Sequence, residues 1–195
     1  MEKIEVNLIG AGGHAKVINA ILIFLGYCLK QVYDDNSFKF RGIQTIQSKP
    51  EGLEKVVIAI GDNKARKKFS SYQNQYISII HPSVLLDQSV VVGNGSMLIH
   101  GSIVQTDTTI GEHVIVNTNA TIDHDCILEN FVHIAPNATL CGNVTVGEGT
   151  LIGATATVLP GVKIGKWCVV GAGSVVYKNL PDFSKVAGIP AKKIK

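Results

Sequence analysis

The sequence lacks lysine and arginine altogether between residues 81 and 162, a stretch that holds seven acidic residues. The flanking regions are basic, because residues 1–80 carry 11 basic and 7 acidic side chains and residues 163–195 carry seven basic and one acidic. A net charge of only +3 gives no indication of nucleic-acid binding. The profile suggests two positive ends that bind phosphates and a negative centre between them; solvated charged turns are the alternative explanation.

Long hydrophobic runs are also absent. The longest, residues 20–25, has six residues, whereas a membrane-spanning helix needs about 20. The N-terminus is charged where a signal peptide would be apolar. The four cysteines form no CxxC pair, so neither a zinc motif nor a disulfide framework is expected. With 46% hydrophobic residues, the sequence predicts a globular, cytoplasmic protein that does not insert into a membrane.

A six-residue repeat fills the second half of the chain. Every sixth residue from Ile80 to Val176 is aliphatic at all 17 positions, and the residue two places earlier is always small or β-branched. Because helices space apolar residues by 3.6 and ordinary strands by 2, this period predicts short strands separated by sharp corners. Three strands close an 18-residue coil, so residues 80–176 predict a parallel β-helix of a little over five coils. An all-β sandwich, the alternative, would space its strands by 8–12 residues and leave the period unexplained.

Glycines mark many of the expected corners, and we expect them to supply positive φ angles there. These glycines are Gly93, Gly95, Gly111, Gly147, Gly149, Gly153, Gly161, Gly165 and Gly171. Among the histidines of the repeat, His100 and His113 are expected on exposed turns.

The first 79 residues alternate between strand-like and helix-like patterns. Apolar strands are expected at residues 4–9, 31–33, 56–60 and 77–80, with one helix that ends at Gly26 and another over residues 63–72. This order predicts a Rossmann-like α/β domain with a parallel sheet. About 80 residues hold only half of a two-lobed dinucleotide fold, so a mononucleotide or a nucleotide joined to a sugar is favoured as the ligand.

The expected nucleotide site follows the strands of this domain. A glycine-rich loop comes directly after the first strand and opens the first helix, where backbone N–H groups face a bound anion. Two aspartates follow the second strand, about where a ribose is held in such folds. The candidate substrate-binding residues are Gly10, Gly12, Gly13, His14, Asp34, Asp35, Gly61 and Arg66. The alternative is that the glycines only make a tight turn.

The whole chain resembles the NeuD/PglD-type sugar O/N-acetyltransferases, a group of hexapeptide-repeat acyltransferases. The resemblance rests on the unbroken repeat, the closing AGIPAK of residues 187–192, and the GAGGH, DD and IGD motifs at residues 10–14, 34–35 and 60–62. It implies a left-handed β-helix, acetyl-CoA as co-substrate, and a homotrimer with active sites between subunits. The implied domains are a nucleotide-sugar domain (1–79), the β-helix (80–178) and a basic tail that completes the acetyl-CoA site (179–195).

His124 is the candidate general base. It follows the inward Ile122 by two residues, which places it at or near a corner, and imidazole titrates near working pH. The family has a histidine followed by Glu or Asp at this position, and here Asp125 would orient the ring. The alternative is a solvated turn with no catalytic function. By the same resemblance, His133 lies near the acetyl-CoA thioester and the Gly142 N–H stabilises the oxyanion.

The resemblance also implies where the remaining cofactor contacts lie. They are Ala154, Gly171, Ala172, Gly173, Ile189 and Pro190. No metal site is expected, because the histidines share no ligand spacing with a carboxylate or cysteine.

These observations predict an acetyl-CoA-dependent N-acetyltransferase for the 4-amino group of a nucleotide-linked 4-amino-4,6-dideoxy sugar. UDP is favoured as the nucleotide by the resemblance to bacillosamine enzymes, and GDP or dTDP remain open. Two alternatives are an O-acetyltransferase of sialic acid or a related sugar, and a trimeric β-helix that serves as a scaffold or binds nucleotide sugars without catalysis.

Overall fold

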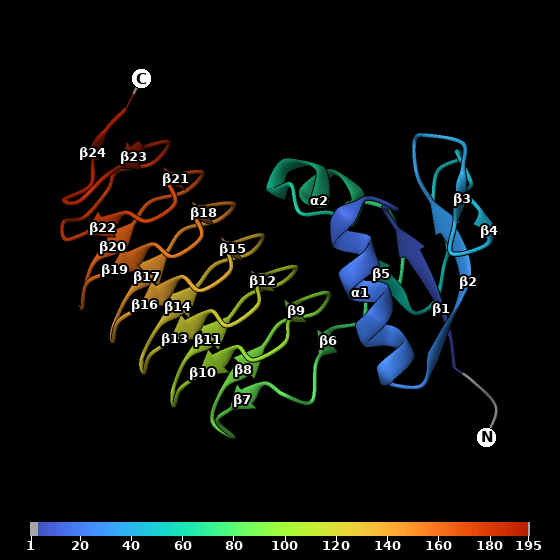
Figure 1. Cartoon of the computed structure of the whole chain (residues 1–195), viewed down its shortest axis with the longest axis horizontal. Coiled ribbons are helices and arrows are strands. Elements are labelled where there is room, and N and C mark those ends of the chain that lie inside the picture. The colour runs from blue at the N-terminus through green and yellow to red at the C-terminus, as the bar shows by residue number, and fades with distance from the viewer. Residues whose placement is uncertain (1–3, 195) are drawn as a thin grey trace. The chain divides into compact units, whose positions relative to one another are not determined.

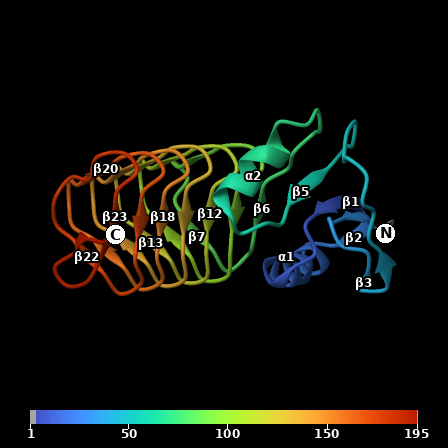
Figure 2. The same cartoon turned by 90° about the horizontal axis from the view of Figure 1, so that it is seen from above.

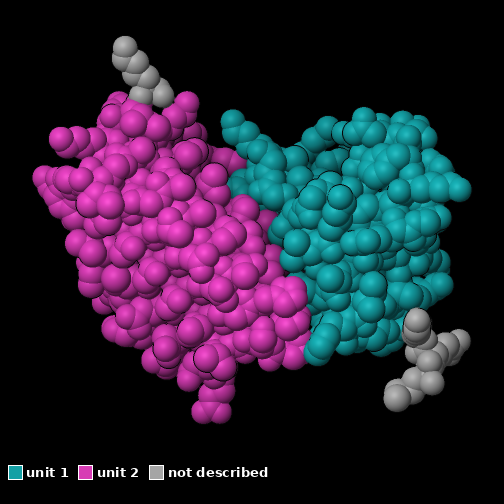
Figure 3. Space-filling view, viewed as in Figure 1, with its two compact units in different colours: residues 1–79 teal, residues 80–195 magenta. Residues whose placement is uncertain are grey.

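The computed structural model describes residues 4–194, and the chain divides into two compact units, residues 1–79 and 80–195 (Figure 3). Among the described residues, no helix is both long and apolar enough to cross a membrane.

The first unit is built on a three-stranded parallel sheet in the order β2-β1-β5 (Figure 1). Its strands are β1 (Ile4–Ile9), β2 (Tyr27–Tyr33) and β5 (Val56–Ile58). Helix α1 (Gly13–Phe24) connects β1 to β2, and α2 (Asn63–Ser70) follows β5. The expected α/β pattern is thus present, although β2 starts four residues earlier than the sequence predicted.

Burial explains why these elements form. The last four residues of β1 are all buried, as expected for the central strand of a parallel sheet. Helix α1 buries Ala15, Ile18 and Leu22, a spacing of three and four residues that forms one apolar face. After the helix, Gly26 takes a φ of 83°, a left-handed conformation that commonly ends helices.

A short hairpin in the first unit was not predicted. It consists of β3 (Lys39–Phe40) and β4 (Ile43–Gln44), which pair antiparallel. The two residues between them, Arg41 and Gly42, both have positive φ, which is the requirement of a type I′ turn. Strands of two residues are too short to produce a recognisable apolar period.

The second unit is a β-solenoid with three sheets along its length (Figures 1 and 2). The first sheet contains β7 (Leu85–Leu86), β10 (Ile103–Val104), β13 (Thr121–Ile122), β16 (Thr139–Leu140), β19 (Thr157–Val158) and β22 (Val175–Val176). The second contains β8 (Val91–Val92), β11 (Thr109–Ile110), β14 (Ile127–Leu128), β17 (Thr145–Val146) and β20 (Lys163–Ile164). The third contains β6 (Ile79–Ile80), β9 (Met97–Leu98), β12 (Ile115–Val116), β15 (His133–Ile134), β18 (Leu151–Ile152), β21 (Val169–Val170), β23 (Lys185–Ala187) and β24 (Lys192–Lys193).

The coil length and the core agree with the repeat. Each strand from β7 to β19 pairs in parallel with the strand 18 residues later, as Val104 does with Ile122. From Leu98 to Val176, every sixth residue is buried, and so is every residue two places before it. The three earlier aliphatic positions of the repeat are partly buried and pack against the same core. The predicted parallel β-helix with a continuous aliphatic interior is confirmed.

The corners of the solenoid share one backbone conformation at a fixed position, whether or not that position holds glycine. Every sixth residue from Gly95 to Gly173 has a positive φ, and most of these residues are not glycine. One of them, His113, lies in a turn as expected but is only 4% exposed, so the prediction of exposure was wrong. Its ring stacks on that of Phe131 with centroids 5.4 Å apart and planes 2° apart, and this contact buries it.

Six of the corner glycines serve a different purpose from the one predicted. Gly93, Gly111, Gly147, Gly153, Gly165 and Gly171 do not have positive φ. A Cβ on Gly147 would lie 2.6 Å from the carbonyl carbon of Gly165, one coil further on, and the other five would meet similarly close atoms. These positions lack a side chain because successive coils approach too closely for one.

The last strands extend the solenoid beyond the aliphatic repeat. Strand β23 pairs in parallel with β21, and β24 folds back antiparallel on β23. These two strands were not predicted, because the six-residue period ends at Val176.

Candidate active site

His124 and Asp125 lie in the turn between β13 and β14. Asp125 occupies the positive-φ position of this turn, with a φ of 57°, and its N–H donates to the Thr106 carbonyl of the preceding coil. We call the stacked turns that follow β10, β13 and β16 the His124 corner. The pair therefore lies at a corner of a coil, as the sequence pattern predicted for His124.

Two aspartates hydrogen-bond to His124, one to its ring and one to its backbone. Its Nδ1 lies 2.7 Å from Oδ2 of Asp125, and its backbone N–H donates to Oδ1 of Asp123 over 2.9 Å. The Asp125 hydrogen bond, followed by the negative charge of Asp123, raises the pKa of His124 above its ordinary value. With Nδ1–H donated to Asp125, Nε2 is the nitrogen that can accept a proton.

Gly142 lies directly beside this ring, one coil further along. A Cβ at this position would come within 2.6 Å of both Cε1 and Nε2 of His124. The Gly142 N–H has no hydrogen-bond acceptor among residues 4–194, while the next N–H along, that of Asn143, donates to the His124 carbonyl. A free backbone donor thus lies next to the candidate base.

Sequence reasoning missed one neighbour of this site. Cys141 lies on the His124 corner immediately before Gly142, although no cysteine stands next to His124 in the sequence. Burial, followed by the charge of Asp123, raises the pKa of this thiol. The 18-residue coil length, which places residue 141 over residue 123, was the signal that would have found it.

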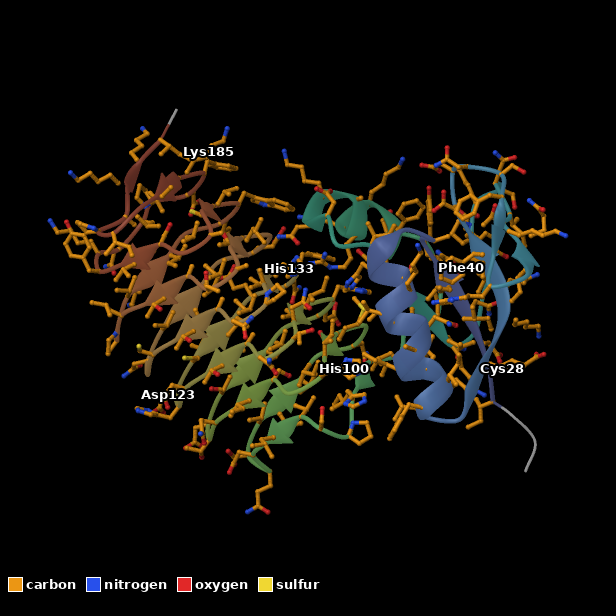
Figure 4. The ribbon with its side chains drawn as sticks, in the orientation of Figure 1. Cys28, Phe40, His100, Asp123, His133 and Lys185 are labelled. Atoms are coloured by element: carbon orange, nitrogen blue, oxygen red, sulfur yellow. The ribbon has the colours of Figure 1, made fainter. Side chains whose placement is uncertain are left out.

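Apart from Gly142, the predicted cofactor residues lie elsewhere on the solenoid. His133 is on β15, in the third sheet, where its Nε2 lies 3.1 Å from Nδ2 of Asn117. Ala154 and Gly173 stack on one another in the turns that follow β18 and β21, joined by a 2.8 Å backbone hydrogen bond. Figure 4 shows His133 and Asp123, the neighbour of His124, on different sides of the solenoid.

The other cofactor candidates share that second corner or follow it. Gly171 and Ala172 lie in the same turn as Gly173, and Ile189 and Pro190 lie in the connection between β23 and β24. Ile189 is 76% exposed. Within one chain, only Gly142 of the predicted cofactor residues contacts His124.

A separate cavity of about 390 Å³ lies in the first unit. Seven of the eight predicted substrate residues line it: Gly10, Gly12, Gly13, His14, Asp34, Asp35 and Gly61. Gly10 has a φ of 95°, and a Cβ there would lie 2.6 Å from Cγ1 of Ile60, so glycine is required where the two loops meet. Arg66, the eighth, is not part of the lining.

The two aspartates of the cavity have different surroundings. Asp34 accepts the Ala11 N–H over 2.9 Å through one oxygen and both the backbone and side-chain N–H of Asn36 through the other. It therefore fixes the glycine loop to the end of β2. Asp35 is exposed, and only its backbone carbonyl is engaged, by Gln47. Asp35 is thus the carboxylate that remains available to a ligand.

His14 lines the cavity from the first turn of α1. Burial, followed by the positive charge of Arg66, lowers its pKa to about 4, so the ring is neutral near pH 7. Its Nε2 is buried and has no hydrogen-bond partner among the described residues. Within the same part of the chain, no group of three His, Cys, Asp or Glu side chains is arranged to hold a metal ion.

The family comparisons cover both units. Residues 5–72 match the PglD N-terminal domain, and residues 107–142, 125–158 and 143–178 match the bacterial transferase hexapeptide (six repeats). The solenoid is therefore a left-handed parallel β-helix of the hexapeptide transferase class, preceded by a Rossmann-like α/β domain.

Solved structures match the whole chain. A histidine-to-asparagine mutant of perosamine N-acetyltransferase from Caulobacter crescentus, in complex with CoA and GDP-perosamine, is 35% identical, has a TM-score of 0.90 and covers 98% of this chain and 97% of its own. The acetyltransferase domain of PglB from Neisseria gonorrhoeae is 33% identical with a TM-score of 0.89, over 97% and 99% of the two chains. The chain belongs to the NeuD/PglD-type sugar acetyltransferases.

Curated relatives match over shorter segments. UDP-N-acetylbacillosamine N-acetyltransferase from Bacillus subtilis is 37% identical over 109 residues, which cover 48% of this chain and 50% of that protein. The chain spans about a quarter and about half of the lengths of two curated relatives that it matches.

Proposed function

We propose that this chain is an acetyl-CoA-dependent N-acetyltransferase that acts on the 4-amino group of a nucleotide-linked 4-amino-4,6-dideoxy sugar. The amine attacks the thioester carbonyl while Nε2 of His124 takes its proton, and the C–S bond then breaks. The CoA thiolate leaves and is protonated by the imidazolium. Transfer is direct, without an acetyl-enzyme intermediate.

The observation that carries this proposal is the pairing of His124 with Asp125. The 2.7 Å contact to Nδ1 selects the tautomer in which Nε2 is the base and stabilises the imidazolium after proton transfer. The N–H of Gly142, which has no acceptor within the described part of the chain, lies beside the ring and is suited to stabilise the oxyanion of the tetrahedral intermediate.

The charges around His124 favour an amine acceptor. Asp123 and Asp125 flank the ring, Asp107 lies in the preceding turn, and no basic residue occurs between residues 81 and 162. Negative potential attracts an ammonium group, whereas it gives no advantage to a neutral sugar hydroxyl. The hydrogen bond to Asp125, followed by the charge of Asp123, raises the pKa of His124, which strengthens it as a base.

The donor side supports a homotrimer as part of the proposal. His124 and the predicted cofactor residues at Ala154 and Gly171–Gly173 lie on different corners of one solenoid. A complete site would therefore combine the His124 corner of one subunit with the cofactor corner of another. Acetyl-CoA would run along the second corner toward the basic residues that follow residue 162.

The cavity of the first unit is the proposed nucleotide site. Its glycine loop opens α1, where free N–H groups favour a phosphate, and exposed Asp35 can accept from a ribose or base. UDP remains the first nucleotide to test, with GDP and dTDP as the other arms. Because acetyl-CoA and nucleotide sugars would have to meet in one compartment, the proposed location is the cytoplasm.

The direct test is a mass-spectrometric screen of UDP-, GDP- and dTDP-linked 4-amino-4,6-dideoxy sugars with acetyl-CoA. We expect one of them to gain an acetyl group on nitrogen. His124→Ala should lower kcat by about 10² to 10⁴ and leave acetyl-CoA affinity intact, whereas His100→Ala, on another corner, should turn over normally.

Two additions to the screen separate the alternatives: free sialic acid as an acceptor, and thermal unfolding in the presence of each nucleotide sugar. An O-acetyltransferase of sialic acid would acetylate the free sugar and gain no thermal protection from nucleotide sugars. A catalytically silent scaffold would bind without turnover. Unchanged turnover of His124→Ala would contradict the proposed base.

A further inference from the structure

Arg66 on α2 is 0% exposed. Arginine is almost never fully buried unless its guanidinium is paired. One of its terminal nitrogens donates to the carbonyls of Ile60 and Gly61, over 3.1 and 3.2 Å, and the other donates to Oδ1 of Asn63 over 2.8 Å. The planar guanidinium thus holds two successive carbonyl groups of one loop.

That loop forms a wall of the nucleotide cavity. Ile60 and Gly61 both line it, and Ile60 also packs against Gly10 at the start of the glycine loop. Arg66 is not part of the lining, but its hydrogen bonds to the Ile60 and Gly61 carbonyls fix two residues of the wall that faces a ligand. Through the contact with Gly10 it also supports the loop expected to bind phosphate.

Binding a nucleoside diphosphate in this cavity would require positive charge, which the side chains of its lining do not provide. Among the described residues that line it, Asp34 and Asp35 are charged and none is lysine or arginine. A nucleoside diphosphate would add two further negative charges. The N-terminus of α1 contributes only a partial positive charge against this total.

The charge of Arg66 acts on a group that lines the cavity. It is one of the two causes that lower the pKa of His14, whose ring lines the cavity. A buried charge acts through protein with little screening by solvent or salt. The same field that disfavours a second positive charge on His14 favours an anion at that point.

We propose that Arg66 is the positioning residue for the diphosphate of the nucleotide sugar, holding the Ile60–Gly61 wall and supplying positive charge to the cavity from behind it. This inference rests on the proposed function of the cavity. It assigns Arg66 an indirect contribution, in place of the direct ligand contact expected from the sequence.

The test compares ligands that differ only in phosphate number. Calorimetry measures affinities on wild type, Arg66→Gln and Arg66→Lys for three ligand series: uridine, UMP and UDP; guanosine, GMP and GDP; and thymidine, dTMP and dTDP. Lys64→Gln is the matched control, since this exposed residue on the same helix carries the same charge. A loss of buried charge should weaken diphosphate binding at least about tenfold more than nucleoside binding.

Arg66→Lys keeps the charge but not the planar fork. We expect it to weaken all three ligands of a series while retaining much of the preference for the diphosphate. Lys64→Gln should bind every ligand within about twofold of wild type, since exposed charges contribute little.

Two failures can be told apart. If wild type binds none of the three series, the proposed nucleotide site is wrong and the inference falls with it. If wild type prefers diphosphates but Arg66→Gln loses the same factor for nucleoside, monophosphate and diphosphate, Arg66 is only structural and the inference alone is overturned. Should Arg66→Gln not fold, loss of the diphosphate preference in folded Arg66→Lys would overturn it as well.

Discussion

The imidazole of His124 rests against the backbone of Gly142, so closely that a single added carbon would lie 2.6 Å from Nε2. Gly142→Ala must therefore displace the ring from its place beside Asp125. Because a displacement of about 1 Å in a catalytic group can cost about 10²-fold in rate, we expect kcat to fall by 10- to 100-fold. Steady-state kinetics on the sugar identified in the screen measure this.

Gly147→Ala is the matched control for Gly142→Ala. It introduces a Cβ 2.6 Å from the backbone of Gly165 on another corner, away from His124. It should lower the melting temperature while kcat stays close to that of wild type. Equal kcat values for the two variants would show that Gly142 matters only for coil packing.

Asp125→Asn should move the pH profile as well as the rate. His124 acts as a base only when neutral, so activity rises as pH increases through its pKa, which the Asp125 hydrogen bond raises. Removing this carboxylate lowers the pKa, and the acid limb of kcat should shift to lower pH while the plateau falls. Kinetics from pH 5 to 9 measure both effects.

Asp107→Asn provides the control for charge. Asp107 occupies the equivalent corner position one coil earlier, with the same φ of 57°. The Asp107→Asn variant should leave the plateau of kcat unchanged and its acid limb nearly unchanged. A profile of Asp125→Asn that matches wild type would exclude Asp125 as the partner of the base.

The solenoid was predictable because its physical requirement is local and repeated. Leu98, Val104 and Ile110 each fill the same interior position, so a six-residue period is written directly into the chain. The coil length of 18 residues also carries information about which side chains stack. This length places Gly142 next to His124 in the adjacent coil, so their contact could have been predicted from the sequence.

Other features had no local signal. Arg66 stands in a helix with Lys64, Lys67 and Lys68, and no residue pattern indicates that it alone is buried. The carboxylate of Asp34 is engaged in the glycine loop while that of Asp35 stays available, and this difference depends on where the Ala11 N–H points after folding. Such properties come from tertiary contacts, which spacing along the chain does not encode.

Cys141→Ser tests the absence of a covalent intermediate. Burial and the charge of Asp123 raise the pKa of the Cys141 thiol, so the reactive thiolate is scarce at neutral pH although the residue lies beside Gly142. We expect the variant to keep its kcat within about twofold, since no proton or acyl transfer passes through residue 141. Intact-protein mass spectrometry after mixing with acetyl-CoA alone should detect no added acetyl group, and an acetylated Cys141 peptide would contradict direct transfer.

His14 should make the stability of the chain depend on pH. Its pKa falls from the ordinary 6.5 to about 4 on folding, so between these values the unfolded state binds the proton and the folded state does not. The stabilisation is therefore present above pH 6.5 and is lost as pH falls; at pH 5 the loss is about 2 kcal/mol. Urea denaturation at pH 7 and pH 5 measures the free energy of unfolding of wild type and of His14→Gln, which cannot take up the proton. The free energy of unfolding should change less between pH 7 and pH 5 in the variant than in wild type, by about this amount. An identical difference in both proteins would mean that His14 stays accessible to protons in the folded state, and that burial and Arg66 do not keep it neutral.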